Sequence, residues 1–300
     1  MDTQFHISAK RQVRRQAKAQ QRPPKQKFTK GTLVVQIVVI LCALVWILPL
    51  FMIVNYSFKT KKELYIGNPM ALPEQFYLKN YENAFQKLNL SATFVNTALY
   101  TLVAVVALAL LCGAAAWAIA RRKGKFFKFA YIYFIVGILI PAQALFLPIY
   151  MVGNTLGLVN TRGGIILMFI ATNLSFGIFL MTSFMSTVPV ELEEAARIDG
   201  CSVYRTYFSI VMPLLKPAMA TLVIMQAFQI WNDYLMSSLY VSSNQLKTMT
   251  VAIQGLFSQQ TSDYSTAFAA IVLSVLPIAI LFIFLQKYFI KGMTVGAVKG

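Results

Sequence analysis

The chain has 300 residues, of which 58% are hydrophobic and 12% are charged, and its mean hydropathy is +0.63. Soluble domains carry about 25% charged residues, so this composition excludes a soluble enzyme, a nucleic-acid-binding domain and a secreted disulfide scaffold. The charges are also segregated, which leaves uncharged runs at 31–58, 88–120, 129–161, 163–190 and 264–286, and a shorter one at 217–232. Since a membrane-spanning helix needs about 20 apolar residues, we expect an all-α integral membrane protein with six transmembrane helices.

In chain order, the six transmembrane helices are predicted near residues 33–57, 92–118, 129–151, 163–184, 215–236 and 266–286. The segments between them then lie alternately on the two sides of the membrane. Twenty of the 27 Lys and Arg fall on one side, in the N-terminal tail, in 121–128, in 186–216 and after residue 286. Because cytoplasmic loops carry an excess of basic residues, both termini are predicted to be cytoplasmic, and the net charge of +17 reflects this topology.

Residues 1–32 are predicted to form a basic cytoplasmic tail, because the first 30 residues contain nine Lys and Arg and few bulky apolar side chains. Such a segment cannot bury enough apolar surface to fold alone, which favours a disordered tail; a helix on anionic lipid headgroups is the alternative. The apolar run that follows is long enough to span a membrane, unlike a cleaved signal peptide. We therefore expect a transmembrane domain over 33–290 and a short cytoplasmic tail over 291–300.

Residues that carry catalytic or metal chemistry are few. The one histidine, His6, lies in the basic tail, and the three cysteines lie in predicted spans or in a cytoplasmic loop (Cys42, Cys112 and Cys201). The sequence has no glycine-rich phosphate loop that ends in Lys-Ser or Lys-Thr, and no basis for a Ser-His nucleophile pair or a histidine metal site. We therefore expect no catalytic residue, no metal ligand and no bound cofactor, and the chain is predicted not to be an enzyme.

The loop between the fourth and fifth predicted spans, 186–216, has the pattern of a folded element. Pro189 suits the first turn of a helix, and three glutamates follow where carboxylates stabilise the positive end of the helix dipole. Gly200 stands where a helix ends in a residue with positive φ, and Ser202 is suited to cap a second short helix. Two prolines then break the chain before the fifth span (Pro213 and Pro217). The pattern predicts two short cytoplasmic helices joined by a tight turn.

Leu192, Ala195 and Ile198 give the first of these helices an apolar face at helical spacing. One interpretation is a helix that rests on the membrane surface. The other is a projection that inserts into a groove on another protein, with Glu194 available to a basic partner. The residues by themselves favour neither interpretation.

The string at 194–200 (Glu-Ala-Ala-Arg-Ile-Asp-Gly), continued by Phe208, Ile210, Pro213 and Pro217, resembles the EAA loop of bacterial ABC importer permeases. Trp-Asn-Asp-Tyr at 231–234 resembles a signature at the outer end of the fifth span of sugar permeases. The run at 286–300 resembles the C-terminus of the smaller permease of the maltose/multiple-sugar class. The resemblance covers residues 33–300, and it implies a type I ABC importer permease fold in a bacterial plasma membrane.

That resemblance implies a permease subunit that imports a carbohydrate, in particular an oligosaccharide. The implied partners are a second permease subunit, two cytoplasmic ATPase subunits that hold ATP and Mg, and an extracytoplasmic solute-binding protein. The EAA loop of such permeases docks into a cleft on the ATPase, so that closure of the ATPase pair switches the spans between inward- and outward-facing states. The tail 292–300 is implied to reach the ATPase, and residues 237–265 the binding protein. The implied docking residues are Glu194, Ala195, Ala196, Asp199, Gly200 and Pro213.

Polar side chains in the predicted spans are candidates for contact with a sugar, which offers hydroxyl edges and apolar C–H faces. Asn173 falls midway along the fourth span, and Gln226, Gln229 and Asn232 follow at helical-turn spacing in the fifth. Asp233 is an acid near the end of that span. Hydrogen bonding between helices is the alternative role for the amides, and an anchor at the lipid headgroups is the alternative for Asp233.

Two other classes of function stay open at this point. A self-sufficient secondary carrier would transport on an ion gradient, but the five long uncharged runs contain none of the acids or bases that ion-coupled carriers commonly use as relays. A membrane scaffold would use the folded loop to recruit an unrelated protein and would transport nothing.

Overall fold

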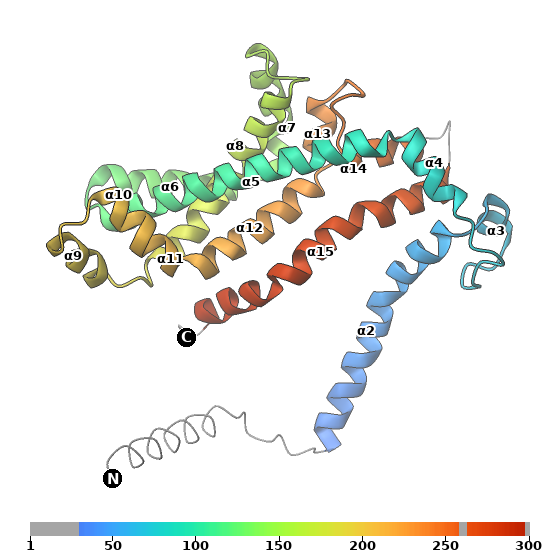
Figure 1. The fold of residues 1–300 in the computed structure, drawn as a ribbon, viewed down its shortest axis with the longest axis horizontal. Coiled ribbons are helices and arrows are strands. Elements are labelled where there is room, and N and C mark those ends of the chain that lie inside the picture. The colour runs from blue at the N-terminus through green and yellow to red at the C-terminus, as the bar shows by residue number, and fades with distance from the viewer. Residues whose placement is uncertain (1–29, 258–262, 298–300) are drawn as a thin grey trace, which may run out of the picture. The chain divides into compact units, whose positions relative to one another are not determined.

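The computed structural model describes residues 30–257 and 263–297 (Figure 1). It divides into two units, Met1–Phe51 and Met52–Gly300. The described part of the first unit belongs to helix α2 (Lys30–Ser57), a continuous helix of 28 residues that contains Pro49. Its sequence has no charged residue after Lys30, so the first predicted span forms a single helix.

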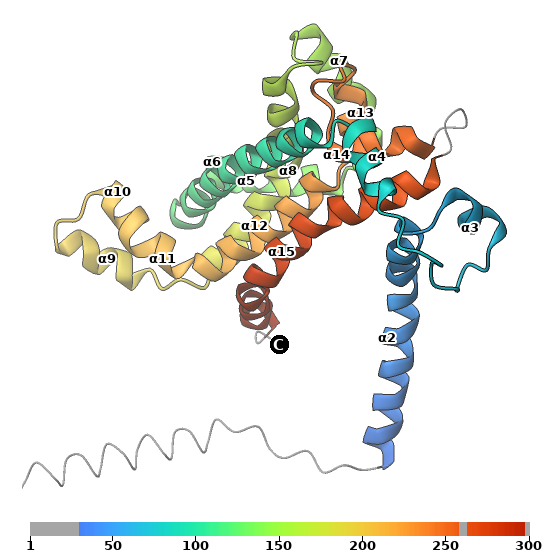
Figure 2. The same ribbon diagram turned by 45° about the vertical axis from the view of Figure 1, so that its right-hand side comes forward.

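Four long helices carry the core of the second unit: α5 (Leu90–Arg121), α8 (Arg162–Met185), α12 (Lys216–Trp231) and α15 (Tyr264–Ala297). α5 packs most extensively against α8, and α12 packs against α5, α8 and α15. Figures 1 and 2 show α5, α12 and α15 side by side in both views. These apolar runs form helices because a helix pairs its own backbone N–H and C=O groups, which have no water to bind inside a membrane.

The buried face of α5 follows a spacing of four residues, which places its members on one side of the helix. The residues that share this face are all 0% exposed (Tyr100, Ala104, Leu108, Cys112 and Ala116). α8 approaches this face closely, since a Cβ on Gly177 would lie 2.4 Å from Sγ of Cys112. The small residues of α5 and α8 therefore set the distance between the two helices.

The third predicted span, 129–151, forms two helices rather than one, α6 (Lys125–Leu139) and α7 (Ala142–Thr155), which meet at 107°. The break falls at Pro141, which has no N–H to donate and restricts Ile140 to an extended conformation, with φ −78° and ψ 120°. In the described ranges, four helices are long and apolar enough to cross a membrane, and six spans result if each bent pair is one span.

The fifth predicted span, 215–236, contains a shorter helix than expected. α12 begins at Lys216 and meets the preceding segment, Val203–Leu214, at 76°. It ends at Trp231, and a new short helix, α13 (Leu235–Tyr240), follows. α14 (Met249–Gln254) and a 3₁₀ turn (Gly255–Phe257) lead on toward α15. Residues 232–234 therefore lie in a connection beyond the span.

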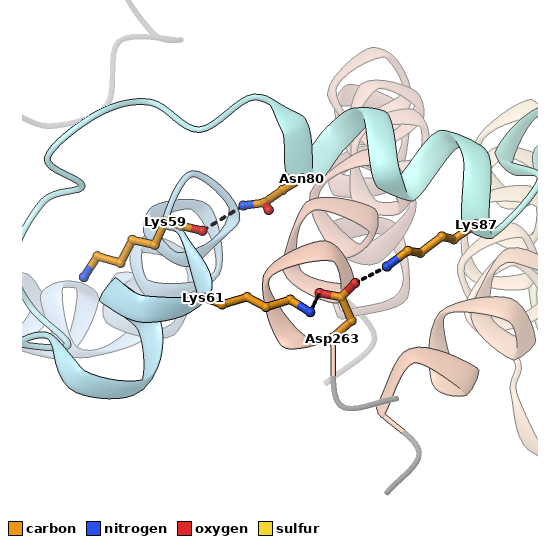
Figure 3. Close-up of polar contacts among 5 residues, drawn as sticks. All are labelled: Lys59, Lys61, Asn80, Lys87 and Asp263. Carbon is orange, nitrogen blue, oxygen red and sulfur yellow. Dashed lines mark hydrogen bonds and ion pairs between the residues drawn. The ribbon is translucent and has the colours of Figure 1, made fainter. Parts of the chain in front are cut away.

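The connection between α2 and α5 is a folded segment with two helices, α3 (Lys61–Ile66) and α4 (Lys79–Lys87). Thr60 and Glu63 form a capping box at the start of α3, and the hydrogen bond from Thr60 lowers the pKa of the Glu63 carboxyl. Asn80 donates to the carbonyl of Ser57 at 2.9 Å. It also donates to the carbonyl of Lys59 at 2.8 Å (Figure 3). These bonds hold the segment against the end of α2.

Asp263 joins this segment to the start of α15. Its side chain is 5% exposed, and its carboxylate pairs with Lys87 of α4 and, at 3.3 Å, with Lys61 of α3 (Figure 3). Burial acts to raise the pKa of Asp263, but the hydrogen bond from Lys87 and the positive charges of both lysines outweigh it, so the net pKa is lowered. The two ion pairs therefore stabilise the contact of α3 and α4 with α15.

Asp263→Asn is expected to lower the free energy of unfolding by about 1 kcal/mol at neutral pH, because half-exposed lysines make only modest ion pairs. The folded-state pKa lies below the ordinary 3.8, so this stabilisation is complete above that value and is lost as the pH falls through the folded pKa. Thermal unfolding in detergent at decreasing pH measures it, with Glu82→Gln, an exposed acid of α4, as the control. A difference between wild type and Asp263→Asn that persists at the acid end would contradict the prediction.

Candidate functional site

The first helix of the loop between α8 and α12 is α9 (Glu191–Ile198), and it ends in a defined turn. Gly200 has φ +77°, its N–H donates to the carbonyl of Arg197 at 3.0 Å, and the N–H of Cys201 donates to the carbonyl of Ala196 at 2.9 Å. This pair of bonds is the Schellman arrangement, which satisfies the last carbonyls of a helix and needs a residue in the left-handed region. Gly200 therefore has the positive φ that the sequence indicates.

The second helix of the loop is α10 (Val203–Thr206), and Oγ of Ser202 caps it by accepting from the N–H of Arg205 at 3.3 Å. A π-helical segment (Tyr207–Val211) and α11 (Met212–Leu214) follow, and α11 contains Pro213. Pro217 lies in the first turn of α12, just after the 76° bend. The chain thus changes direction between the two prolines.

Most residues that the resemblance assigns to docking lie on the surface of this loop. The exposed ones are Glu194, Ala195, Asp199, Gly200 and Pro213. Ala196 is only 4% exposed and packs inward. Several large apolar side chains of the loop are also exposed, and the most exposed are Ile198 at 87% and Tyr204 at 79%. A group of exposed apolar side chains on a folded loop is typical of a surface that contacts a partner protein or a membrane.

Glu193 is the acid of α9 that the sequence does not single out. Its side chain is 6% exposed, and its carboxylate accepts hydrogen bonds from Nε of Arg121 and Nε1 of Trp117, both at 2.8 Å. Nη2 of Arg121 also donates to the carbonyl of Val188 at 2.7 Å. Three glutamates stand close together in α9, and the position of α5 decides which of them is buried.

A cavity of about 660 Å³ lies among α6, α7, α8, α12 and α13. Three of the five residues predicted to contact substrate line it, namely Asn173, Gln229 and Asp233, together with aromatic side chains such as Phe169 and Phe176. An apolar and aromatic wall with a few polar groups is typical of a small-molecule site. It suits a sugar, which has apolar faces and hydroxyl edges.

Hydrogen bonds fix the position of Asp233 beside this cavity. Its Oδ1 accepts from the N–H and from the hydroxyl of Ser237, each at 2.8 Å. Its backbone carbonyl accepts from Oγ1 of Thr250 at 2.6 Å. Asp233 therefore ties the end of α12 to α13 and α14, which keeps the cavity wall in place.

The other two predicted residues do not line this cavity. Gln226 is 1% exposed, and its Nε2 donates to the backbone carbonyl of Asn173 at 3.5 Å. Asn232 is exposed and turns back to donate to the carbonyl of Phe228 at 2.9 Å. The predicted row of amides is therefore divided among three environments, because α8 covers Gln226 and because Asn232 lies past the end of α12.

Known proteins resemble this chain along most of its length. Residues 108–295 match the family described as "binding-protein-dependent transport system inner membrane component". The chain is 35% identical over 260 residues to a probable starch degradation products transport system permease protein of Thermoanaerobacterium thermosulfurigenes, covering 87% of this chain and 94% of that protein. It is 33% identical over 273 residues to the melibiose/raffinose/stachyose import permease protein of Bacillus subtilis, covering 91% of this chain and 98% of that one.

A solved structure has the same arrangement of helices. It is the crystal structure of a bacterial ABC transporter involved in the import of the acidic polysaccharide alginate. One of its chains superposes with a TM-score of 0.78, at 21% identity, over 88% of this chain and 100% of that chain. This likeness confirms the all-helical membrane fold expected from the sequence.

Proposed function

Because the chain belongs to the family of binding-protein-dependent transport system inner membrane components, the permease subunits of ABC importers, we propose that it forms one half of the membrane path for an oligosaccharide. Permeases of this family are multi-pass proteins of the bacterial inner membrane, and they are not enzymes, because a separate subunit hydrolyses ATP. Relatives named for starch degradation products and for melibiose, raffinose and stachyose support a sugar as substrate.

The cavity beside α8 and α12 is the observation that carries the proposal of a sugar path. Its lining combines the amides of Asn173 and Gln229 and the carboxylate of Asp233 with phenylalanine side chains. A volume of about 660 Å³ is within the range of known ligand sites, about 300–1,000 Å³. The polar side chains would accept and donate hydrogen bonds at the sugar's edge, and the aromatic rings would cover its C–H faces.

The exposed surface of the EAA loop is the proposed docking site for the ATPase. Glu194, Ala195, Asp199 and Gly200 would enter the cleft of the ATPase, with Pro213 at the base of the loop and ATP and Mg held by the ATPase itself. Ala196 is inward-facing, so its proposed part is to complete the turn rather than to touch the partner.

Two further partners follow from the same proposal. A second permease would complete the membrane path, and a solute-binding protein would deliver the sugar on the side where residues 237–265 lie. The side chains of the C-terminal tail, 292–300, fall outside the described part of the structure, and their contact with the ATPase stays a prediction.

Reconstitution of the purified complex in liposomes, with the binding protein and labelled malto-, raffinose- and arabino-oligosaccharides, tests this function. We expect uptake of one sugar class that requires ATP on the ATPase side and persists when ion gradients are collapsed. Uptake on an ion gradient without ATP would identify a secondary carrier instead. Capture of a soluble partner without any uptake would identify a scaffold.

Gln229→Ala is expected to raise the sugar concentration for half-maximal uptake by about fivefold, because the side chain is exposed to the cavity and one hydrogen bond to the sugar contributes about 1 kcal/mol net. Asn173→Ala should act in the same direction. Asn232→Ala is the matched control, because Asn232 lies three residues further along the chain, is also an exposed amide and does not line the cavity. Equal effects of Gln229→Ala and Asn232→Ala would contradict the assignment of the cavity.

A further inference from the structure

One face of α5 contacts the EAA loop through three of its residues. Gly113, Trp117 and Arg121 are spaced by four residues and so lie on the same side of the helix. Trp117 and Arg121 hold the carboxylate of Glu193, both at 2.8 Å. The ring of Tyr207 packs on the ring of Trp117, with centroids 5.1 Å apart. We name Gly113, Trp117 and Arg121 the receiving stripe.

Gly113 belongs to this stripe because the hydroxyl of Tyr207 fills the space that a side chain at position 113 would need. A Cβ on Gly113 would lie 2.6 Å from the hydroxyl oxygen of Tyr207. The loop is thus seated against α5 at two separate points, through a charge from α9 and through a ring from the π-helical segment. Two contacts on one rigid helix fix the orientation of the loop as well as its position.

The ion pair between Arg121 and Glu193 strongly constrains the position of α9 on α5, because both charged groups are largely shielded from water. The side chain of Arg121 is 15% exposed and that of Glu193 is 6% exposed. A buried charge is tolerated where a partner and hydrogen bonds compensate its lost hydration. Glu193 therefore cannot separate from Arg121 without leaving an unpaired charge buried, and α9 is expected to move together with the end of α5.

The covalent route from α9 to the membrane helices is much less direct. It passes through the left-handed turn at Gly200, through the π-helical segment Tyr207–Val211, and through the 76° bend before Lys216. π-Helical segments and proline-associated breaks are the places where a helical path bends. A displacement of α9 would be absorbed at these joints before it reached α12.

We infer that Glu193 is a positioning residue that transmits movement of the docking helix to α5 through the receiving stripe. α5 packs most extensively against α8 and also against α12, and α8 and α12 carry Asn173 and Gln229 of the cavity. A movement of α5 would therefore reach the cavity wall directly. This inference rests on the proposed docking of the loop to an ATPase and adds the route by which docking acts.

The test compares Glu193→Gln with Glu191→Gln in the purified, reconstituted complex. Both variants remove one carboxylate from α9, but Glu191 is exposed whereas Glu193 is bonded to α5. We expect Glu193→Gln to retain the ATPase at wild-type stoichiometry and to hydrolyse ATP, while the amount of sugar transported per ATP falls at least tenfold. Glu191→Gln should match the wild type in all three quantities. Wild-type transport per ATP in Glu193→Gln would overturn the inference.

The double variant Arg121→Gln/Glu193→Gln keeps the test valid if the single variant fails to fold, because it leaves no unpaired buried charge. It should show about the same loss of transport per ATP as Glu193→Gln, since both lack the same link. A multiplicative loss in the double variant, or loss of the ATPase from Glu193→Gln complexes, would show that Glu193 acts by another route. A wild-type complex without ATP-driven uptake would overturn the docking proposal itself, which is a separate outcome.

Discussion

Gly200→Val is expected to reduce ATP-driven uptake by about tenfold or more while the protein reaches the membrane at its normal level. Gly200 has φ +77°, and an L-residue held in the left-handed region costs about 1–2 kcal/mol, with a β-branched residue at the upper end. The turn would relax to another conformation and displace Glu194, Ala195 and Asp199 from their common surface. Uptake by whole cells, normalised to membrane abundance, is the measurement.

Gly200→Asn is the matched control for this prediction. Asparagine adopts the left-handed conformation more readily than other residues with a side chain, and a Cβ at this position meets no atom within 4 Å. It should therefore retain most of the uptake. Equal losses in Gly200→Val and Gly200→Asn would show that side-chain bulk at the proposed docking surface, and not the backbone conformation, determines uptake.

Gly164→Ala is expected to lower the free energy of unfolding by about 3 kcal/mol, at the upper end of what forced overpacking costs. A Cβ on Gly164 would lie 1.8 Å from the carbonyl oxygen of Leu158. That oxygen belongs to the backbone, so it has no side-chain rotation by which to move aside. The turn it belongs to is also anchored, since the N–H of Asn160 donates to the carbonyl of Tyr240 at 2.7 Å.

The neighbouring Gly163 supplies the control, because a Cβ there meets no atom within 4 Å. Gly163→Ala should leave the stability within about 0.5 kcal/mol of the wild type, as surface substitutions usually do. Thermal unfolding of both variants in detergent, together with their abundance in the membrane, measures the difference in stability between them. If the two variants unfolded alike, the close packing of Gly164 on the turn would be contradicted.

The EAA loop is the part of the site that local sequence described best. Three features each depend on residues within a few positions in the chain: the turn at Gly200 that follows α9, the cap at Ser202 and the break before Pro217. Turns and caps of this kind are set by local backbone chemistry. Their geometry could therefore be predicted without knowledge of the rest of the fold.

Burial within the same loop could not be predicted in this way. Glu191, Glu193 and Glu194 are alike in charge and helix position, and Glu193 is distinguished by the side chains of Trp117 and Arg121, more than 70 residues away. The same holds for the amides of α12, because Gln226 and Gln229 differ in surroundings that α8 supplies. Contacts between distant segments decide such cases, and one sequence does not specify them.

The break at Pro141 shows a different failure of the sequence pattern. The uncharged run at 129–161 is long enough for one span, and hydropathy treats it as uniform. Proline and the extended residue before it interrupt the helix regardless of how apolar the surroundings are. Proline thus determines the geometry of α6 and α7, whereas hydropathy reports only that the segment belongs in the membrane.

Affinity purification of this chain from its native membrane in mild detergent, with mass spectrometry of the proteins that accompany it, tests the central claim most directly. We expect a second multi-span permease and an ATPase in the eluate, together with ATP hydrolysis that is lost when the ATPase is removed. Recovery of the chain alone, or of a homo-oligomer without an ATPase, would contradict the claim that this protein is one half of an ATP-driven importer.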